Sequence, residues 1–173
     1  MKLKEFFILV CILIASNAGY AEGVKPTRYG FDIIERHTDI NAEYSSYDMC
    51  FFYADAIARN EMLSASQLSQ LKADVPKGGV LSVNHGGIYW DVANGGNWTF
   101  IITDESGHEL YRTKGRDCSE QKDDPYVITT GTFGKMVWLH EDIKIPVVLP
   151  DRFKVYMASR KGRDRAVYLF MKK

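Results

Sequence analysis

NWTFIITDESGHELYR, residues 97–112, is the stretch that decides the fold class of this chain. Trp98, Phe100 and Ile102 occupy alternate positions, and this period of two is typical of a β-strand with one buried face. The segment 105–107 follows, where glycine can adopt the positive φ of a tight turn, and a second β-rich run comes after it. The stretch therefore predicts an antiparallel hairpin.

Segments of the same kind recur on both sides of this hairpin. They are rich in Val, Ile, Tyr, Trp and Phe, and turn signals separate them about every 8–12 residues. Because no spacer between them is long enough for a crossover helix, we expect mainly antiparallel pairing. Pro146 cannot donate to a ladder, so its strand is expected at an edge or a bulge. The expected strands lie near 79–84, 87–92, 97–103, 108–113, 126–130, 135–140, 142–148, 152–158 and 165–171.

Two helices are expected before these strands, within about 45–74. Ser45 and Asp48 form a capping box ahead of MCFFYADAIARN, and Ser64 with Gln67 forms another ahead of a shorter helix. The segment before them, 22–44, fits neither period clearly, and we assign no element to it.

Together these patterns predict an α+β protein. A short N-terminal helical hairpin is expected to pack on a mainly antiparallel β-sandwich or partly closed barrel, with the β-rich part at about 79–171. A hydrophobic content of 46% argues against disorder. The chain therefore fits one globular domain, residues 22–173.

The first 21 residues resemble a cleavable secretory signal peptide. Lys2 and Lys4 form a short basic head, an apolar run covers 6–15, and small residues Gly19 and Ala21 suit a cleavage site. Ten apolar residues are too few to span a bilayer, so we do not expect an integral membrane protein. The predicted location is the periplasm or the extracellular space.

Export changes how the three cysteines are interpreted. Cys11 is removed with the signal peptide, which leaves Cys50 and Cys118. Because exported chains fold in an oxidising compartment, the even pair predicts a Cys50–Cys118 disulfide.

Cys50 is also the basis of the only catalytic hypothesis. It lies in the first turn of a predicted helix, which stabilises a thiolate, and His85 on a following segment could share its proton. Between about 48 and 91 the arrangement resembles papain-like cell-wall amidases and endopeptidases of the NlpC and CHAP kinds. The resemblance implies a cysteine amidase or peptidase that uses Cys50 and His85. The alternative is a structural half-cystine and an ordinary loop histidine, which the predicted disulfide favours.

Neither a metal site nor a cofactor is expected. His37, His108 and His140 lie in separate segments without zinc-ligand spacing. The loop DCSEQKDD offers carboxylates but lacks the spacing of a calcium loop, and its acidic residues are Asp117, Glu120, Asp123 and Asp124.

The C-terminal segment 151–173 is the most basic part of the chain. It carries eight Lys or Arg side chains against two Asp, although the whole chain has a formal net charge of zero. Tyr156, Tyr168 and Phe170 lie among these charges. The segment either docks an acidic partner or is an edge hairpin whose charges prevent strand addition. The candidate binding residues are Trp90, which we expect to be exposed, and Arg160, Lys161, Arg163 and Arg165.

The leading functional hypothesis is an exported, non-enzymatic binding or accessory protein. Its partner is expected to be a protein or a glycan, and nucleic acid is not expected because the chain has no net positive charge. The alternatives are the cysteine amidase or peptidase described above and a secreted inhibitor or immunity-type protein.

Overall fold

The structure is a computed structural model of the full chain. It describes residues 26–37, 40–87, 93–117, 128–130, 136–160 and 164–173. The predicted signal peptide lies outside these residues, so export stays a prediction.

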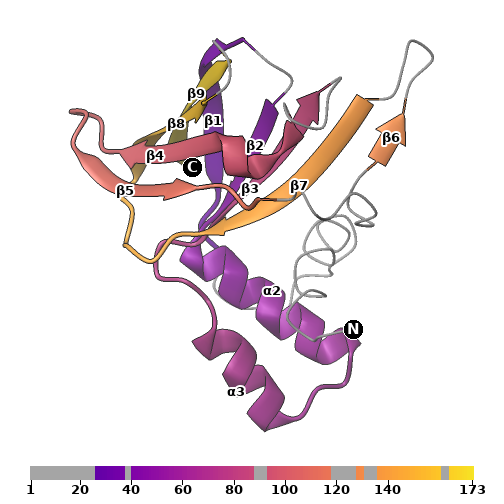
Figure 1. The fold of residues 1–173 in the computed structure, drawn as a ribbon. Helices are drawn as coiled ribbons and strands as arrows, with labels where there is room; N and C mark the ends of the chain where they lie inside the picture. Colours follow the sequence, from indigo (N-terminus) through magenta and orange to yellow (C-terminus); the bar gives the residue numbers. More distant parts are fainter. Residues whose placement is uncertain (1–25, 38–39, 88–92, 118–127, 131–135, 161–163) are drawn as a thin grey trace.

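Five antiparallel strands form the larger sheet (Figure 1). The predicted hairpin at 97–112 is confirmed as its β4 and β5, and Gly107 has the positive φ expected at the turn, 93°. In spatial order the strands are β1 (Tyr29–Arg36), β9 (Arg165–Lys172), β8 (Arg152–Ser159), β4 (Trp98–Thr103) and β5 (Glu109–Lys114).

The smaller sheet has four antiparallel strands. Its β7 replaces two predicted strands, 135–140 and 142–148, and ends before Pro146, which therefore lies in no ladder. In spatial order the strands are β2 (Ile40–Ser45), β3 (Val80–Gly87), β7 (Met136–Lys144) and β6 (Ile128–Thr130).

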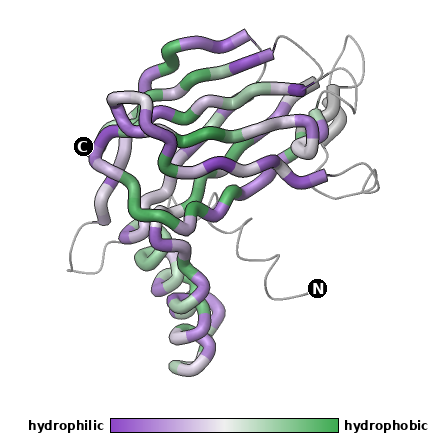
Figure 2. The backbone as a smooth tube through the Cα atoms, turned by 60° about the vertical axis from the view of Figure 1, so that its left-hand side comes forward, coloured by the Kyte–Doolittle hydropathy of each residue, from purple (hydrophilic) through white to green (hydrophobic). Residues whose placement is uncertain are grey.

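The two sheets share one hydrophobic core. Trp98, Phe100 and Ile102 are buried in it, as their alternation predicted. Apolar residues recur along the strands of both sheets (Figure 2), and the Tyr44 ring of β2 meets the Phe153 ring of β8 edge-on at 4.9 Å. The arrangement is consistent with the predicted β-sandwich. The sheets are not closed, so the partly closed barrel is not confirmed.

The C-terminal hairpin differs from its prediction in two respects. It lies inside the larger sheet, between β1 and β4, and is not an edge hairpin. Tyr168 and Phe170 are buried in the core with Ala166, whereas the sequence suggested them for docking. Edge protection therefore does not explain the basic charges of this hairpin.

Two helices follow β2: α2 (Tyr47–Asn60) and α3 (Ala65–Ala73). The N-cap of α2 is Ser46, one residue beyond the predicted Ser45, and the predicted capping box of α3 is present. Lys72 of α3 forms an ion pair with Asp55 of α2 at 2.7 Å. The helices project from one end of the sheets (Figure 1), and α3 has no buried residue, so the prediction that a helical hairpin packs on the sandwich is not confirmed.

The structure also contains two strands that the sequence did not predict. Both lie in the unassigned segment 22–44: β1 forms one edge of the larger sheet and β2 forms one edge of the smaller sheet. A β-bulge interrupts the pairing of β1 with β9 between Ile33 and Glu35.

Candidate functional sites

The structure does not bring Cys50 and His85 together. Cys50 lies in the first turn of α2, and its Sγ donates to the Ser45 carbonyl at 3.6 Å. Ser45 pairs with Val80 at one end of β2, whereas His85 pairs with Ile40 at the other end. The two pairs are five residue steps apart along the strand, about 16 Å at the usual rise. The predicted thiol–imidazole pair is therefore absent from this arrangement.

The predicted disulfide stays a prediction. Cys50 is buried, as a half-cystine or any structural cysteine would be. Cys118 lies outside the described residues, within which no disulfide is seen.

His85 is a core residue of β3 and not a loop histidine. Its side chain is 1% exposed, and its ring lies 5.4 Å from the Trp98 ring and 5.8 Å from the Phe100 ring. Its Nε2 lies 3.5 Å from Oε1 of Glu141 on β7. Within the described residues neither ring nitrogen has a hydrogen-bond partner. No local sequence pattern signals this pair, because it depends on the register of β3 and β7.

Glu141 also holds two loops in place. Its Oε2 accepts a hydrogen bond from the Arg116 backbone N–H at 2.6 Å. A Cβ at Gly95 would lie 2.7 Å from Oε2, and a Cβ at Gly115 would lie 2.4 Å from Oε1. The loops therefore reach this carboxylate only because both residues are glycine. Buried in this way, the His85–Glu141 pair is suited to joining the loops to the sheets rather than to meeting a substrate.

A second polar cluster lies on the outer face of the smaller sheet. The Ser82 hydroxyl donates to Oδ1 of Asp142 at 2.5 Å, and Nε2 of His140 lies 3.3 Å from the same oxygen. His140 contacts Asn84 through Nδ1 at 2.8 Å. In a serine hydrolase the imidazole stands between the hydroxyl and the carboxylate. Here the carboxylate stands between them, so this order does not activate Ser82 as a nucleophile.

Metal binding finds no support in the described segments. No group of three or more potential His, Cys, Asp or Glu ligands occurs in them. His37 contacts Glu35 at 2.6 Å, and His108 contacts Asp104 at 3.3 Å, both on the surface. Of the acidic loop DCSEQKDD, the structure describes Asp117 alone, and its Oδ1 accepts from the Asn94 amide at 2.9 Å.

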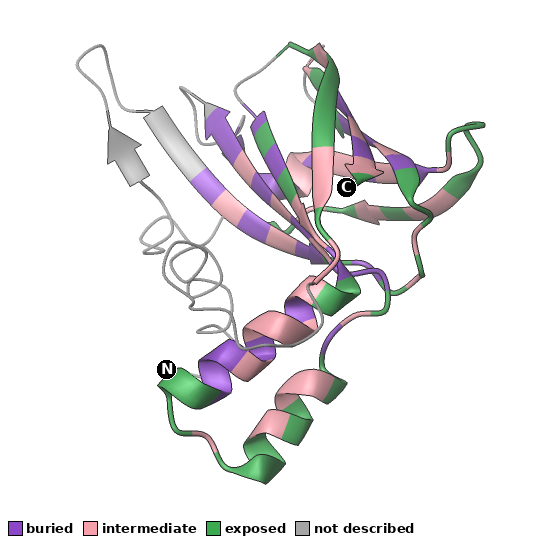
Figure 3. Ribbon diagram, turned by 180° about the vertical axis from the view of Figure 1, so that it is seen from behind, coloured by how far each residue is buried: buried purple, intermediate pink, exposed green. Residues whose placement is uncertain are grey.

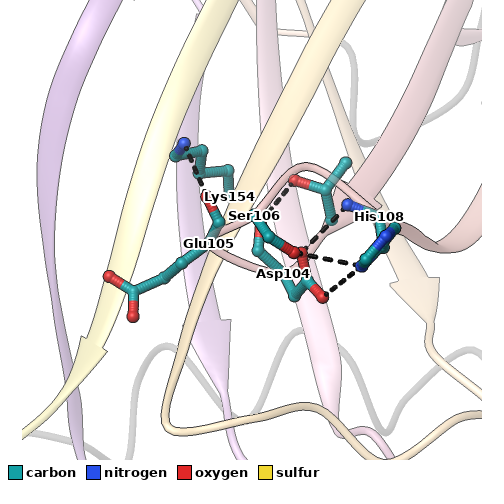
Figure 4. A network of polar contacts seen from close by, with 6 residues as sticks. Asp104, Glu105, Ser106, His108 and Lys154 are labelled. Atoms are coloured by element: carbon teal, nitrogen blue, oxygen red, sulfur yellow. Dashed lines mark hydrogen bonds and ion pairs between the residues drawn. The ribbon is translucent and has the colours of Figure 1, made fainter.

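Asp104 is the centre of a surface network at the β4–β5 turn (Figure 4). Its Oδ1 accepts from the Ser106 hydroxyl at 2.6 Å and from the His108 backbone N–H at 2.9 Å. These donors stabilise the charged form, and they lower the pKa of Asp104 to about 2. The network fixes the turn, and Lys154 of β8 joins it by donating to the Glu105 carbonyl at 3.3 Å.

Three of the six described basic side chains of the C-terminal hairpin form ion pairs. Arg152 pairs with Glu105 at 2.9 Å, Lys172 pairs with Asp151 at 3.2 Å, and Arg165 pairs with Glu35 of β1. Of the predicted binding residues, Arg160 and Arg165 are exposed, and Trp90, Lys161 and Arg163 lie outside the described residues. The charges therefore do not form one unpaired basic patch in this part of the chain.

Among the strand residues whose burial is described, the most exposed large apolar side chains belong to β1. Phe31, Ile33 and Ile34, here called the β1 apolar edge, are 46%, 46% and 55% exposed. Figure 3 shows this strand exposed over much of its length, next to strands whose inward residues are buried. The Phe31 ring contacts the Tyr168 and Phe170 rings of β9, so it lies on the core-facing side of the sheet.

The backbone of β1 also offers hydrogen-bonding groups at this edge. The Lys173 N–H donates to the Arg28 carbonyl at 2.9 Å, and Tyr29 pairs with Lys172. In an antiparallel ladder this pattern directs the backbone groups of Gly30 and Asp32 toward β9. The N–H and C=O groups of Tyr29, Phe31 and Ile33 therefore point away from it. No described strand pairs with that side of β1.

Comparison of the chain with models of protein families, with curated proteins and with solved structures finds no match. The described helices include none that is long and apolar enough to span a membrane.

Proposed function

We propose that this chain is an exported, non-enzymatic binding protein whose β1 edge accepts an extended polypeptide segment as an additional strand. The observation that carries the proposal is the β1 apolar edge. Strand addition obtains affinity from main-chain hydrogen bonds at an open sheet edge and specificity from alternate side chains. The edge strand β1 supplies both the outward-pointing main-chain groups and the exposed apolar side chains.

The exposure of Phe31 and Ile33 supports this proposal because of where they lie. Inward residues of the neighbouring strands, such as Phe170 and Phe153, are at most 1% exposed. Phe31 and Ile33 face the same side and are nearly half exposed. An added strand next to β1 would cover them and extend the core.

The edge has natural limits that define the length of the binding segment. At one end the Thr27 carbonyl already accepts from the Ser46 hydroxyl at 2.7 Å. At the other end the bulge after Ile33 twists the strand, a device that commonly prevents further pairing. The accessible stretch is therefore 29–33, which suits a short strand and not a long one.

To test the proposal, peptides are selected from a displayed random library for binding to the mature chain. Each selected peptide is then synthesised with N-methyl groups on alternate backbone amides. Because strand addition uses every second N–H, one methylated set should abolish binding and the other should leave it nearly unchanged.

Two variants locate the binding surface. Ile33→Lys should remove peptide binding, whereas the matched control Val148→Lys, at an apolar residue 74% exposed in a loop, should not. Equal sensitivity of the two methylated sets, or equal loss with both variants, would refute strand addition at β1.

A further inference from the structure

We infer that the strand which completes the β1 edge is β1 of a second copy of this chain. This inference rests on the proposed function and names the partner. Two identical edges can pair antiparallel about a two-fold axis, and such an interface is closed because the same surface is used on both copies. The two five-stranded sheets would then form one continuous sheet.

The open stretch of β1 fixes the register of this pairing. Residues 29–33 are bounded by Thr27, whose carbonyl is occupied, and by the bulge after Ile33. The register that uses this whole stretch on both copies is centred on Phe31. It places Phe31 opposite Phe31 of the second copy and Tyr29 opposite Ile33 of the second copy. All of these positions direct their backbone groups outward, so each pair can exchange two hydrogen bonds.

The side chains are self-complementary in this register. On the core-facing side every pair is apolar or aromatic, a type of cross-strand pair that stabilises sheets. The pairing would cover Phe31 and Ile33, which are nearly half exposed in the single chain. This is the apolar surface that the rest of the fold leaves uncovered on β1.

Charge selects the same register over its neighbours. Centred on Phe31, the pairing sets Asp32 opposite Gly30 of the second copy. Centred on Asp32 instead, it would set two carboxylates directly opposite each other, which is destabilising. Centred on Gly30, it would set Ile33 opposite Thr27, whose carbonyl already accepts from Ser46. Without Lys2, Lys4 and Glu5 of the predicted signal peptide, the chain has a formal net charge of −1, which adds little long-range repulsion between copies.

The test introduces charges of either sign at residue 31, which faces residue 31 of the second copy across the two-fold axis. Phe31→Asp and Phe31→Lys are prepared separately and mixed, and sedimentation equilibrium measures self-association of each sample and of the unaltered chain. Each variant alone should dimerise at least about tenfold more weakly than the unaltered chain, because like charges face each other. The mixture of the two variants should recover most of the association. Circular dichroism confirms that both variants are folded.

A matched pair at a second position tests the register itself. Ile33→Asp and Ile33→Lys should weaken dimers but should not rescue each other on mixing, because residue 33 faces Tyr29 and not residue 33. Rescue at 33 without rescue at 31 would overturn the register and with it the inference.

The unaltered chain gives an outcome that needs no variant. If it remains monomeric up to millimolar concentration, the second copy is excluded as the partner. A monomer that still binds methylation-sensitive peptides through Ile33 would overturn this inference and leave the proposed function standing, whereas absence of both activities would overturn both.

Discussion

Glu141 is held by groups that lie far from it in the sequence. Its carboxylate accepts from the Arg116 backbone N–H, lies 3.5 Å from the imidazole of His85 and leaves no room for a Cβ at Gly95 or Gly115. A buried carboxylate of this kind is retained only when its surroundings supply partners. No local pattern predicts it, because the contacts depend on how two loops lie against Glu141 within β7.

Gly115 lies where an added side chain would collide with its surroundings. Gly115→Ala should lower the free energy of unfolding by about 2–3 kcal/mol, because the new Cβ would lie 2.4 Å from both Glu141 Oε1 and the Gly95 carbonyl oxygen. Urea denaturation measures the change. The control is Gly30→Ala, whose Cβ meets only the end of the flexible Lys173 side chain and should cost less than about 0.5 kcal/mol. Equal stability of both variants would contradict the crowded site.

The surface network at the β4–β5 turn makes Asp104 titrate at low pH. Hydrogen bonds from Ser106 and His108 lower its pKa in the folded chain to about 2, below the ordinary value of 3.8. Its contribution to stability is therefore present above about pH 4 and is lost as the pH falls toward 2.

Carboxyl-carbon NMR should place the Asp104 midpoint near that lowered value. Ser106→Ala should raise it toward the ordinary value by removing the first donor, whereas Lys154→Ala, which contacts only the Glu105 carbonyl, should leave it unchanged. A midpoint at the ordinary value in the unaltered chain would contradict the network in Figure 4.

At the scale of elements, one-sided burial decided which strands could be predicted. In β4 and β8 the inward residues are buried and the outward ones are partly exposed, so the alternation is clear. β1 was missed because Phe31, Ile33 and Ile34 are all partly exposed and the bulge interrupts the period of two. The exposure and the bulge, which make the β1 apolar edge a candidate site, therefore also prevented its prediction from the sequence.

The candidate polar sites were missed for a different reason. Ser82 and Asp142 are 60 residues apart in the chain and meet only through the register of β3 and β7. Neither this register nor the order of strands in a sheet follows from local sequence patterns. For the same reason the Cys50–His85 hypothesis could be formed from the sequence but could not be tested by it.

The turn between α2 and α3 contains a non-glycine residue with a positive φ. Met62 has a φ of 52° and is 93% exposed, a left-handed conformation that costs most residues energy and glycine almost none. Met62→Gly should raise the free energy of unfolding by about 0.5–1 kcal/mol. Met62→Ala keeps a Cβ and should give no such gain, so an equal gain from both variants in urea denaturation would show that backbone strain is not the cause.

At the scale of the whole molecule, a few polar contacts join two sheets that are otherwise held by apolar packing. Tyr168 of β9 is buried, and its hydroxyl donates to the Ile40 carbonyl of β2 at 2.7 Å. Burial also raises the pKa of this phenol above its ordinary value. The bond connects the larger sheet to the edge strand of the smaller sheet, at the side of the molecule where β1 lies.

Tyr168→Phe should therefore lower the free energy of unfolding by about 1–2 kcal/mol, because it leaves the Ile40 carbonyl without this donor. Tyr156→Phe on the opposite face of the same sheet is the matched control and should change stability little. Thermal or urea unfolding measures the free energy of unfolding of both variants. Equal losses would show that the hydrogen bond between Tyr168 and Ile40 contributes no more stability than the hydroxyl of Tyr156.

Strand addition requires that β1 is an open edge whose outward backbone groups can bind a further strand. Residue-resolved amide hydrogen exchange tests it, with and without a saturating selected peptide, at a concentration at which the chain without peptide is monomeric. Gly30 and Asp32 already donate toward β9, so their exchange should change little, whereas the amides of Tyr29, Phe31 and Ile33 should become strongly protected. Protection spread evenly along β1, or confined to other strands, would rule out strand addition at the β1 edge.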